Sequence, residues 1–436
     1  MEDRLDLWAL VLLALDTLKK RERVLLVGAE FRQDSRWSME DSLKELSELV
    51  DTAGGVVAGQ MICRLKKPHA AMLIGSGKAA ELAEVSQEQD IDIIIFDDEL
   101  SPVQVRNLSS LCQKKVIDRS QLILDIFSRR ARTKEAQIQV ELAQLQYLRP
   151  RLTGQWLHLS RQEGGIGTRG PGETQLEVDK RRVSARIMKL KEDLNRVKRE
   201  KDVQSKKRLE EKIPVVSIIG YTNAGKTTLF NRLSKSSNLV ENRLFATLDT
   251  TVRQVELEGS FQILLSDTVG FIRKLPHHLV ESFKTTLSEA TTASVLLIVV
   301  DVNDPLIDEK YEVVSLVLSE LGCSEIPKIL VLNKIDLIEK PQLLIKWLKS
   351  REVTVPISAK LGDGMGLLTA KVAQILSEKW VRVKLVIPFS EGKIMSQLRK
   401  HGRILKEDFL PEGVSLEIEI PPSIFERVSD YRVNGA

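Results

Sequence analysis

Apolar runs and helical patterns alternate along the first third of the chain. Between Arg23 and Phe127, short apolar runs bounded by polar residues predict strands, and apolar residues three and four apart predict helices. Strands that alternate with helices indicate an α/β layer. The strands we expect are Val24–Val27, Val56–Leu65, Met72–Ile74 and Asp92–Phe96, with helices at Ser38–Val50 and Lys78–Val85 and a further helix beginning at Ser101-Pro102.

Two long helical patterns follow, separated by a glycine-rich stretch. The first covers Ala131–Arg149, and the second runs from about Thr174 to Lys212, with apolar residues at the alternating spacings typical of a coiled-coil seam. Two such helices on either side of one loop predict an antiparallel hairpin. The apolar stripes are Ile138, Leu142 and Leu145 on the first helix, and Val183, Ile187, Leu190, Leu194 and Val197 on the second.

The second half of the chain returns to buried-type strands. We expect them at Val215–Ile219, Phe261–Leu265, Ile329–Leu332 and Val353–Ile357. The tail from Val381 to Ala436 reads strand, helix (Glu391–Lys400), strand (Val414–Ile420) and a short helix (Ser423–Val428). The chain is therefore predicted to be multidomain α/β. The expected parts are an N-terminal α/β domain (1–130), a helical hairpin (131–212) with its loop (150–173), a third domain (213–380) and a small C-terminal α/β domain (381–436).

Composition excludes several classes of protein. With 42% hydrophobic and 29% charged residues in 436, the chain is neither disordered throughout nor a collagen or coiled-coil rod. Its three cysteines are widely spaced, which argues against a disulfide framework or a cysteine metal site and fits a reducing compartment. The apolar run Trp8–Leu15 is too short for a membrane helix and lacks a preceding basic region. We expect a cytoplasmic monomer without an integral membrane segment; peripheral membrane association stays open.

Positive charge is concentrated in the predicted hairpin. The whole chain carries +4, but Pro150 to Lys212 holds 17 Lys and Arg against 10 Asp and Glu, a net charge of +7. Lysine-rich surface helices often serve solubility alone. Here, however, the loop adds glycines, which let a backbone approach a partner closely, and arginines, which pair with phosphate or stack on bases. The candidate RNA contacts are Arg161, Gly167, Arg169 and Gly170.

A phosphate-binding motif follows the strand Val215–Ile219. It leads into the helical pattern Leu229–Leu233, which is the strand–loop–helix setting that such a loop requires. Its glycines permit a turn whose amides point at phosphate oxygens at the positive end of a helix. Lys226 would place a charge between the terminal phosphates, and the Thr227 hydroxyl would coordinate Mg²⁺. The motif comprises Gly220, Tyr221, Thr222, Asn223, Ala224, Gly225, Lys226, Thr227 and Thr228.

A second motif selects guanine over adenine. Asn333-Lys334-Ile335-Asp336 follows the strand Ile329–Leu332. The carboxylate of Asp336 can accept hydrogen bonds from N1–H and the 2-amino group of guanine, whereas adenine lacks both donors. Ser358-Ala359-Lys360, after Val353–Ile357, stands where a further base-contacting loop belongs. GTP and GDP are therefore the expected ligands.

Two segments between these motifs are expected to respond to the γ-phosphate. Asp267-Thr268-Val269-Gly270 ends the strand Phe261–Leu265; Asp267 would hold Mg²⁺ through water and the Gly270 amide would sense the γ-phosphate. Upstream, a threonine of Phe245–Thr251 would complete the Mg²⁺ shell. Thr247 is our first choice, and Thr250 and Thr251 remain open.

Motifs in this order, from Ile213 to about Trp380, resemble the translation-factor-related class of P-loop GTPases. Ras-like members place a water-orienting Gln where this chain has Phe271, so intrinsic hydrolysis should be slow without help. Several relatives with Asn at the position of Asn223 use it to coordinate a monovalent cation. The resemblance therefore implies K⁺ assistance or activation by a partner, although Asn223 also fits a purely loop-stabilising role.

Longer stretches resemble the HflX family. They are 267–289 around the second switch, Phe245–Asp249, the glycine-rich 164–177, and 98–108 in the first domain. One departure is Thr250, where the family usually has proline.

The HflX resemblance implies a ribosome-associated GTPase. HflX proteins bind the large subunit, place the glycine-rich loop near the peptidyl-transferase centre on 23S rRNA, and split stalled 70S particles. Two alternatives remain open on the residues alone. One is a GTPase of ribosome assembly or RNA modification, and the other is a non-catalytic RNA-binding scaffold, against which the intact Lys226–Thr227–Asp267 set argues.

Overall fold

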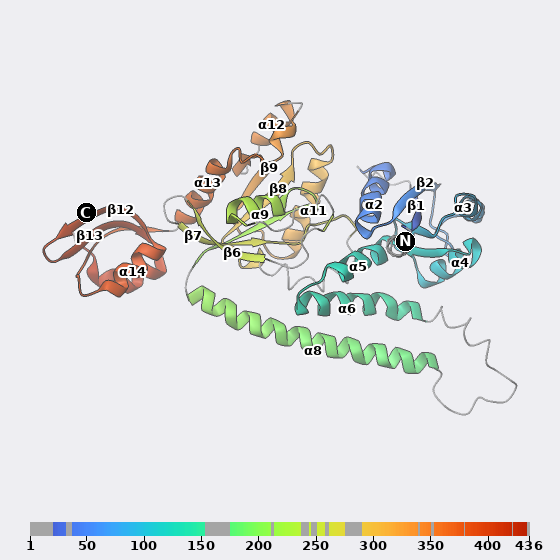
Figure 1. The fold of residues 1–436 in the computed structure, drawn as a ribbon, viewed down its shortest axis with the longest axis horizontal. Helices are drawn as coiled ribbons and strands as arrows, with labels where there is room; N and C mark the ends of the chain where they lie inside the picture. The colour runs from blue at the N-terminus through green and yellow to red at the C-terminus, as the bar shows by residue number, and fades with distance from the viewer. Residues whose placement is uncertain are drawn as a thin grey trace, which may run out of the picture. The chain divides into compact units, whose positions relative to one another are not determined.

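A computed structural model gives the fold of the chain (Figure 1). It describes residues 21–31, 37–152, 175–210, 213–236, 244–245, 251–257, 261–274, 290–338, 341–349, 353–378, 380–420 and 422–433. The chain divides into two compact units, Met1–Arg129 with Gln144–Ala185, and Arg130–Ala143 with Arg186–Ala436.

A four-stranded parallel sheet forms the centre of the first unit. The strand order is β2-β1-β3-β4, and apolar side chains such as Leu25, Ile94 and Phe96 fill the core against the helices. The strands are β1 (Arg23–Phe31), β2 (Val56–Leu65), β3 (Ile93–Phe96) and β4 (Lys115–Asp118), and the helices are α2 (Met39–Ala53), α3 (Ser76–Glu88), α4 (Pro102–Cys112) and α5 (Arg119–Arg130).

Most of the expected elements of this unit are confirmed. α4 begins where predicted, because the Ser101 hydroxyl and the Gln104 side chain form a reciprocal capping box. The predicted strand Met72–Ile74 is wrong. Leu73 has a φ of +60° and exchanges backbone hydrogen bonds of 2.7 and 2.8 Å with His69, so this segment closes a turn. β4 and α5 were not predicted.

Buried charges at the carboxyl end of β3 are paired. The Arg119 side chain, 2% exposed, donates to Asp97 Oδ1 at 2.7 Å and also pairs with Glu45 of α2. The Ser42 hydroxyl donates to the other Asp97 oxygen at 2.8 Å. Because a buried charge is tolerated only with such partners, this network ties α2 and the start of α5 to the sheet.

A second buried carboxylate, Asp118, fixes the entry to the glycine-rich stretch. It accepts hydrogen bonds from the Tyr147 hydroxyl at 2.9 Å, from Arg151 at 3.3 Å and from the Leu100 amide at 3.1 Å. The Arg151 guanidinium lies 3.5 Å over the Tyr147 ring. Burial, and then the charge of Asp118, raise the pKa of Tyr147, so its hydroxyl remains a donor. These contacts fasten the end of α6 (Lys134–Leu148) and the 3₁₀ turn Arg149–Arg151 to β4.

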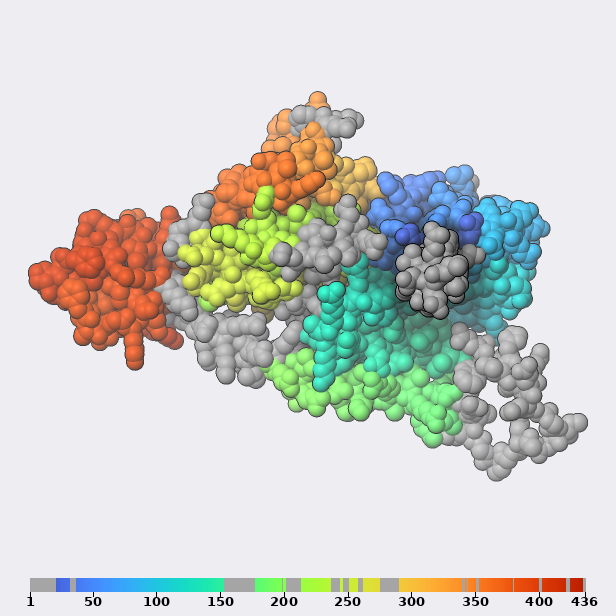
Figure 2. Space-filling model, in the orientation of Figure 1, coloured from blue at the N-terminus to red at the C-terminus, as the bar shows by residue number. Residues whose placement is uncertain are grey.

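The predicted hairpin helices are present. α6 and α8 (Gln175–Glu210) run side by side in opposite directions, and Arg186 of α8 donates two hydrogen bonds to Glu141 of α6, at 2.7 and 2.8 Å. Figure 2 shows α8 at the surface. Four residues of the predicted apolar stripes are buried: Ile138, Leu142, Ile187 and Leu190. Basic residues of α8 that are exposed include Arg181, Arg182, Lys189, Lys191, Arg196 and Arg199.

The second unit contains a six-stranded sheet of order β10-β9-β8-β5-β7-β6, in which only β6 is antiparallel to its neighbour. Its core includes Val216, Ile218, Leu297 and Val331. The strands are β5 (Val215–Gly220), β6 (Thr251–Leu257), β7 (Phe261–Asp267), β8 (Val295–Asp301), β9 (Lys328–Asn333) and β10 (Val353–Pro356). The helices are α9 (Lys226–Ser234), α11 (Ile307–Glu320), α12 (Pro341–Leu348) and α13 (Met365–Ser377). The expected α/β architecture is confirmed.

The C-terminal part forms a three-stranded antiparallel sheet of order β11-β13-β12. Leu385, Leu416 and Ile418 pack with the helices to form its core. Its elements are β11 (Val381–Ile387), α14 (Gly392–His401), β12 (Arg403–Leu410), β13 (Gly413–Ile420) and α15 (Pro422–Val428). No helix in the described part of the chain combines the length and apolar character that crossing a bilayer would require.

The hydrogen bond from the Tyr147 hydroxyl to Asp118 predicts that Tyr147→Phe destabilises the structure locally. Loss of the buried hydrogen bond should destabilise the end of α6 by about 1 kcal/mol. Amide hydrogen exchange at residues 148–151 should therefore quicken about fivefold, since 1.4 kcal/mol corresponds to a tenfold change. Tyr431→Phe is the matched control, because no hydrogen bond of the Tyr431 hydroxyl occurs within the described residues. Equal exchange in both variants would show that Asp118 does not hold the helix end.

Candidate nucleotide-binding site

The loop between β5 and α9 has the backbone of an anion-binding turn. Asn223 and Gly225 both have left-handed φ angles, +61° and +93°. A Cβ on Gly225 would lie 2.2 Å from Nδ2 of Asn333, so only glycine fits this position. Lys226 then begins α9, whose first amides have no partner within the helix and can donate to an anion. The predicted strand–loop–helix arrangement is confirmed.

Lys226 is buried beneath this loop. Its ammonium donates to the Tyr221 carbonyl at 2.6 Å, and a Cβ on Gly270 would approach its Nζ within 2.8 Å. The structure therefore brings together the lysine and the glycine that were expected to face the terminal phosphates. Burial lowers the pKa of Lys226 to about 8, while the charge of Asp267 opposes that shift.

A hydroxyl and a carboxylate suited to Mg²⁺ meet beside Lys226. Thr227 Oγ1 donates to Asp267 Oδ2 at 3.2 Å, and Asp267 is 1% exposed at the end of β7. Hard cations prefer such oxygen ligands, and Mg²⁺ is usually bound by one or two protein groups together with phosphates and water. The described residues contain no group of three or more His, Cys, Asp or Glu able to hold a metal alone. The donor set therefore fits a Mg²⁺ ion that arrives with a nucleotide.

Asn333 joins the phosphate end of the site to the base end. Its Nδ2 donates to the Ala224 carbonyl at 2.9 Å, and its Oδ1 accepts from the Ala359 amide at 3.0 Å. The adjacent turn is braced by Ser358, whose Oγ accepts from the Leu361 amide at 3.1 Å. The three predicted motifs therefore converge through one buried side-chain amide.

Asp336 lies on the exposed 3₁₀ turn Ile335–Leu337, next to this junction. The Ile335 amide donates to the Ile357 carbonyl at 3.2 Å, which holds the turn against the end of β10. No protein group in the described part of the chain binds the Asp336 carboxylate. It is thus available to accept hydrogen bonds from a base.

Lys334 is positioned by two residues that the motif search missed. Its φ is +64°; its ammonium lies 2.7 Å from Asp301, and its carbonyl accepts from Asn303 Nδ2 at 2.8 Å. Asp301 is the last residue of β8, and Asn303 lies just beyond it; β8 is the parallel neighbour of β9. Polar residues at the end of a buried strand next to the motif-bearing strand were the available signal.

The second switch is tied to the phosphate loop through the backbone of Phe271. Its amide donates to the Gly220 carbonyl at 3.1 Å, and its carbonyl accepts from the Thr222 amide at 2.8 Å. The Tyr221 hydroxyl accepts from the Arg273 amide at 2.8 Å. Phe271 is buried, so the place of the expected Gln is occupied by an apolar ring.

Other predicted residues have mixed surroundings. The Thr268 hydroxyl is fully buried and donates to the Ile218 carbonyl at 2.8 Å, so a contact with nucleotide would have to use its backbone. Thr222 and Val269 are buried, Thr228 is partly buried, and Asn223 is exposed. Thr251 opens β6 opposite Asp267 in the strand register. The predictions at Thr247, Thr250, Arg161, Gly167, Arg169 and Gly170 lie outside the described residues.

Comparison with known proteins identifies relatives over nearly the whole chain. Family models described as the N-terminal part of a GTP-binding GTPase, its middle region, and a 50S ribosome-binding GTPase match residues 40–128, 130–208 and 215–334. The chain is 43% identical to GTPase HflX of Caldanaerobacter subterraneus subsp. tengcongensis, over 95% of each protein. It is 44% identical to GTPase HflX of Escherichia coli, over 92% of this chain and 94% of that protein. A Sulfolobus solfataricus GTP-binding protein in complex with GDP aligns with TM-score 0.43 and 27% identity, over 82% of this chain and 99% of that chain.

The lowered pKa of Lys226 predicts that nucleotide binding takes up a proton. Below pH 8 the lysine is already charged; above it, phosphate must draw a proton onto Nζ, so affinity falls as pH rises. GDP should bind about fourfold more weakly at pH 8.5 than at pH 7, as a pKa near 8 dictates. Calorimetry at pH 8 in buffers of different ionisation enthalpy measures the uptake directly. Absence of uptake would contradict the burial argument.

Asp336→Asn should exchange guanine for xanthine specificity. The carboxylate matches the two donors of guanine, whereas an amide can donate to the 2-oxo group of xanthine. GDP affinity should fall at least about 100-fold, because two charge-assisted hydrogen bonds are lost. Xanthosine diphosphate should bind the variant more tightly than the original protein. Leu337→Ala, an exposed neighbour, is the control and should leave both affinities unchanged.

Proposed function

The chain belongs to the HflX family of GTPases and hydrolyses GTP, and on that premise we propose that it binds the large ribosomal subunit and splits stalled 70S ribosomes. The observation that carries the ribosomal part is the match of residues 215–334 to a model described as a 50S ribosome-binding GTPase. The exposed basic residues along α8 support an RNA partner, because Lys and Arg side chains neutralise backbone phosphates.

Nucleotide binding would use the residues that the fold brings together. Lys226 and the first amides of α9 would bind the phosphates, and Asp336 would bind guanine. Thr227 and Asp267 would hold Mg²⁺, which when bound neutralises phosphate charge. Asn333 connects the phosphate loop to the loop Ser358-Ala359-Lys360, so the phosphates and the base would be bound at a fixed separation.

The state of the nucleotide would be reported through Gly270 and Phe271. Gly270 lies beside Lys226, where its amide can meet a γ-phosphate, and Phe271 is hydrogen-bonded to the phosphate loop on both sides of its backbone. A change at Gly270 would therefore be passed to the segment that follows Arg273. GTP would favour the ribosome-binding conformation, and hydrolysis would favour release.

Hydrolysis is expected to be slow until the protein meets its partner. The buried ring of Phe271 cannot orient a water molecule. The exposed Asn223 is the candidate ligand for K⁺, and ribosome-induced rearrangement of the two switches is the competing source of activation. Comparing rates in K⁺ and Na⁺, with and without 50S subunits, separates the two contributions.

The glycine-rich loop would enter the ribosome near the peptidyl-transferase centre. We infer that Arg161 and Arg169 contact 23S rRNA there and that Gly167 and Gly170 allow the close approach. The entry to the loop is held by Asp118 through Tyr147 and Arg151, which would fix the point from which the loop extends.

Reversing both loop charges tests this assignment. Arg161→Glu/Arg169→Glu should weaken binding of the GTP-bound protein to 50S subunits by about tenfold to 100-fold, because two phosphate contacts are lost and repulsion is added. GTP affinity should not change. The control is Lys66→Glu/Lys67→Glu, the same charge change at adjacent exposed residues of the first unit.

The ribosomal assay separates the proposed function from its alternatives. Sucrose gradients should show GTP-dependent conversion of 70S particles into subunits, with GTPase stimulation by 50S and 70S particles. Stimulation by precursor RNA alone would indicate an assembly factor, and no stimulation by any particle would indicate a scaffold. Unchanged 50S binding by the loop variant would contradict the insertion of this loop.

A further inference from the structure

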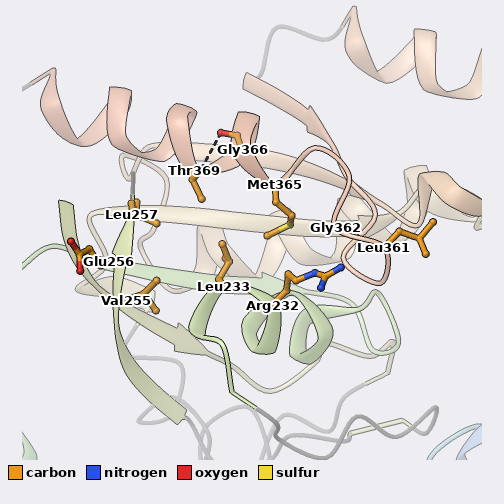
Figure 3. A pocket seen from close by; sticks show the side chains of 10 residues that line it. All are labelled: Arg232, Leu233, Val255, Glu256, Leu257, Leu361, Gly362, Met365, Gly366 and Thr369. Carbon is orange, nitrogen blue, oxygen red and sulfur yellow. Dashed lines mark hydrogen bonds between the residues drawn. The ribbon is translucent and has the colours of Figure 1, made fainter. Parts of the chain in front are cut away.

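A hollow of about 450 Å³ lies on the second unit, between α9, β6 and α13 (Figure 3). Its apolar lining residues include Leu233, Val255, Leu257 and Met365. Arg232 and Gly362 stand together at one end, where the side chain of Arg232 reaches the turn that follows β10. This end of the hollow adjoins Ser358-Ala359-Lys360, the loop expected to contact the base.

Arg232 makes two contacts with that loop. Its Nη2 donates to the Lys360 carbonyl at 3.0 Å. Its guanidinium also lies against Gly362, because a Cβ there would be 2.7 Å from Nη2, 3.2 Å from Cζ and 3.3 Å from Nε. Gly362 has a φ of +101°, so the position is already one that favours glycine.

The same loop is held from the nucleotide side by Asn333. The Ala359 amide donates a hydrogen bond to Asn333, and the carbonyl of the next residue, Lys360, accepts one from Arg232. The turn is closed by the Gly362 amide, which donates to the Ser358 carbonyl at 2.7 Å. The loop is therefore held from two sides. Asn333 connects it to the phosphate loop, and Arg232 connects it to α9, the helix that follows the phosphate loop.

We propose that Arg232 is a positioning residue for guanine recognition. From the last turn of α9 it fixes Ser358-Ala359-Lys360 before a base arrives, which reduces the ordering that binding would otherwise require. Its own contacts are with the backbone of this loop, at the Lys360 carbonyl and at Gly362. Its loss should therefore lower affinity for the guanosine part of the ligand and spare the phosphate part.

The first test compares GDP with inorganic pyrophosphate, a ligand without a base. Arg232→Ala should weaken GDP about threefold to tenfold, the range for one hydrogen bond at a solvent-accessible site. Pyrophosphate affinity, measured by displacement of a fluorescent GDP, should stay within twofold. Arg253→Ala is the matched control, since Arg253 is an exposed arginine of β6 in the same unit. A GDP affinity unchanged in Arg232→Ala, or an equal loss for both ligands, would overturn the proposal.

A double-mutant cycle tests the contact with Gly362. Gly362→Ala puts a methyl group where the guanidinium lies and should displace it, so GDP affinity falls. In the Arg232→Ala background the same change should have a smaller effect, because no guanidinium remains to be displaced. Fully additive losses would overturn the contact. If Gly362→Ala does not fold, as thermal unfolding would show, the comparison of GDP with pyrophosphate in Arg232→Ala decides alone.

Discussion

The side-chain amide of Asn333 is the interaction on which the nucleotide site depends. Asn333 is 2% exposed. Its side-chain NH₂ donates a hydrogen bond to the Ala224 carbonyl, and its side-chain oxygen accepts one from the Ala359 amide. A buried amide with both ends paired is strongly directional, since an unpaired end would leave a desolvated polar group. It therefore fixes the distance between the phosphate loop and the base-contacting loop. The same close packing explains why Gly225 admits no side chain.

The remaining parts of the site follow from sheet topology. β5, β7, β8 and β9 are parallel neighbours, so their carboxyl ends meet at one edge of the sheet. Asp267, Asp301 and Asn333 end three of these strands, and Gly220 ends the fourth. One edge thus gathers the carboxylate proposed to hold Mg²⁺, the partner of Lys334, the bridging amide and the start of the phosphate loop. Short-range motifs become one site because the strands that carry them are adjacent.

Sequence reasoning succeeded where a local pattern has a local cause. The capping box at Ser101, the strand before Gly220 and the seam containing Ile187 each depend on residues a few positions apart. It failed where the local structure depends on residues far away in the sequence. β12 was missed because it is an edge strand with a shift of register between Ile404 and Lys406, which breaks the period of two.

The residues that position the site and the loop illustrate the same limit. Tyr147 and Asp118 are 29 positions apart, and Arg232 reaches Lys360 across 128. Neither pair belongs to a sequence motif, because only the fold brings the two partners together. The glycines of the phosphate loop and the aspartate of the guanine motif were identifiable because nucleotide chemistry requires those residue types at fixed spacing.

The chain passes between its two compact units inside helices. The boundaries fall at the last residue of α5, within α6 after Ala143, and within α8 after Ala185. A helix resists bending because each turn is closed by several backbone hydrogen bonds. α6 is fastened to β4 at one end through Tyr147, and Glu141 of the same helix is paired with Arg186. Each of these contacts lies within one unit: Tyr147 and Asp118 belong to the first, and Glu141 and Arg186 to the second.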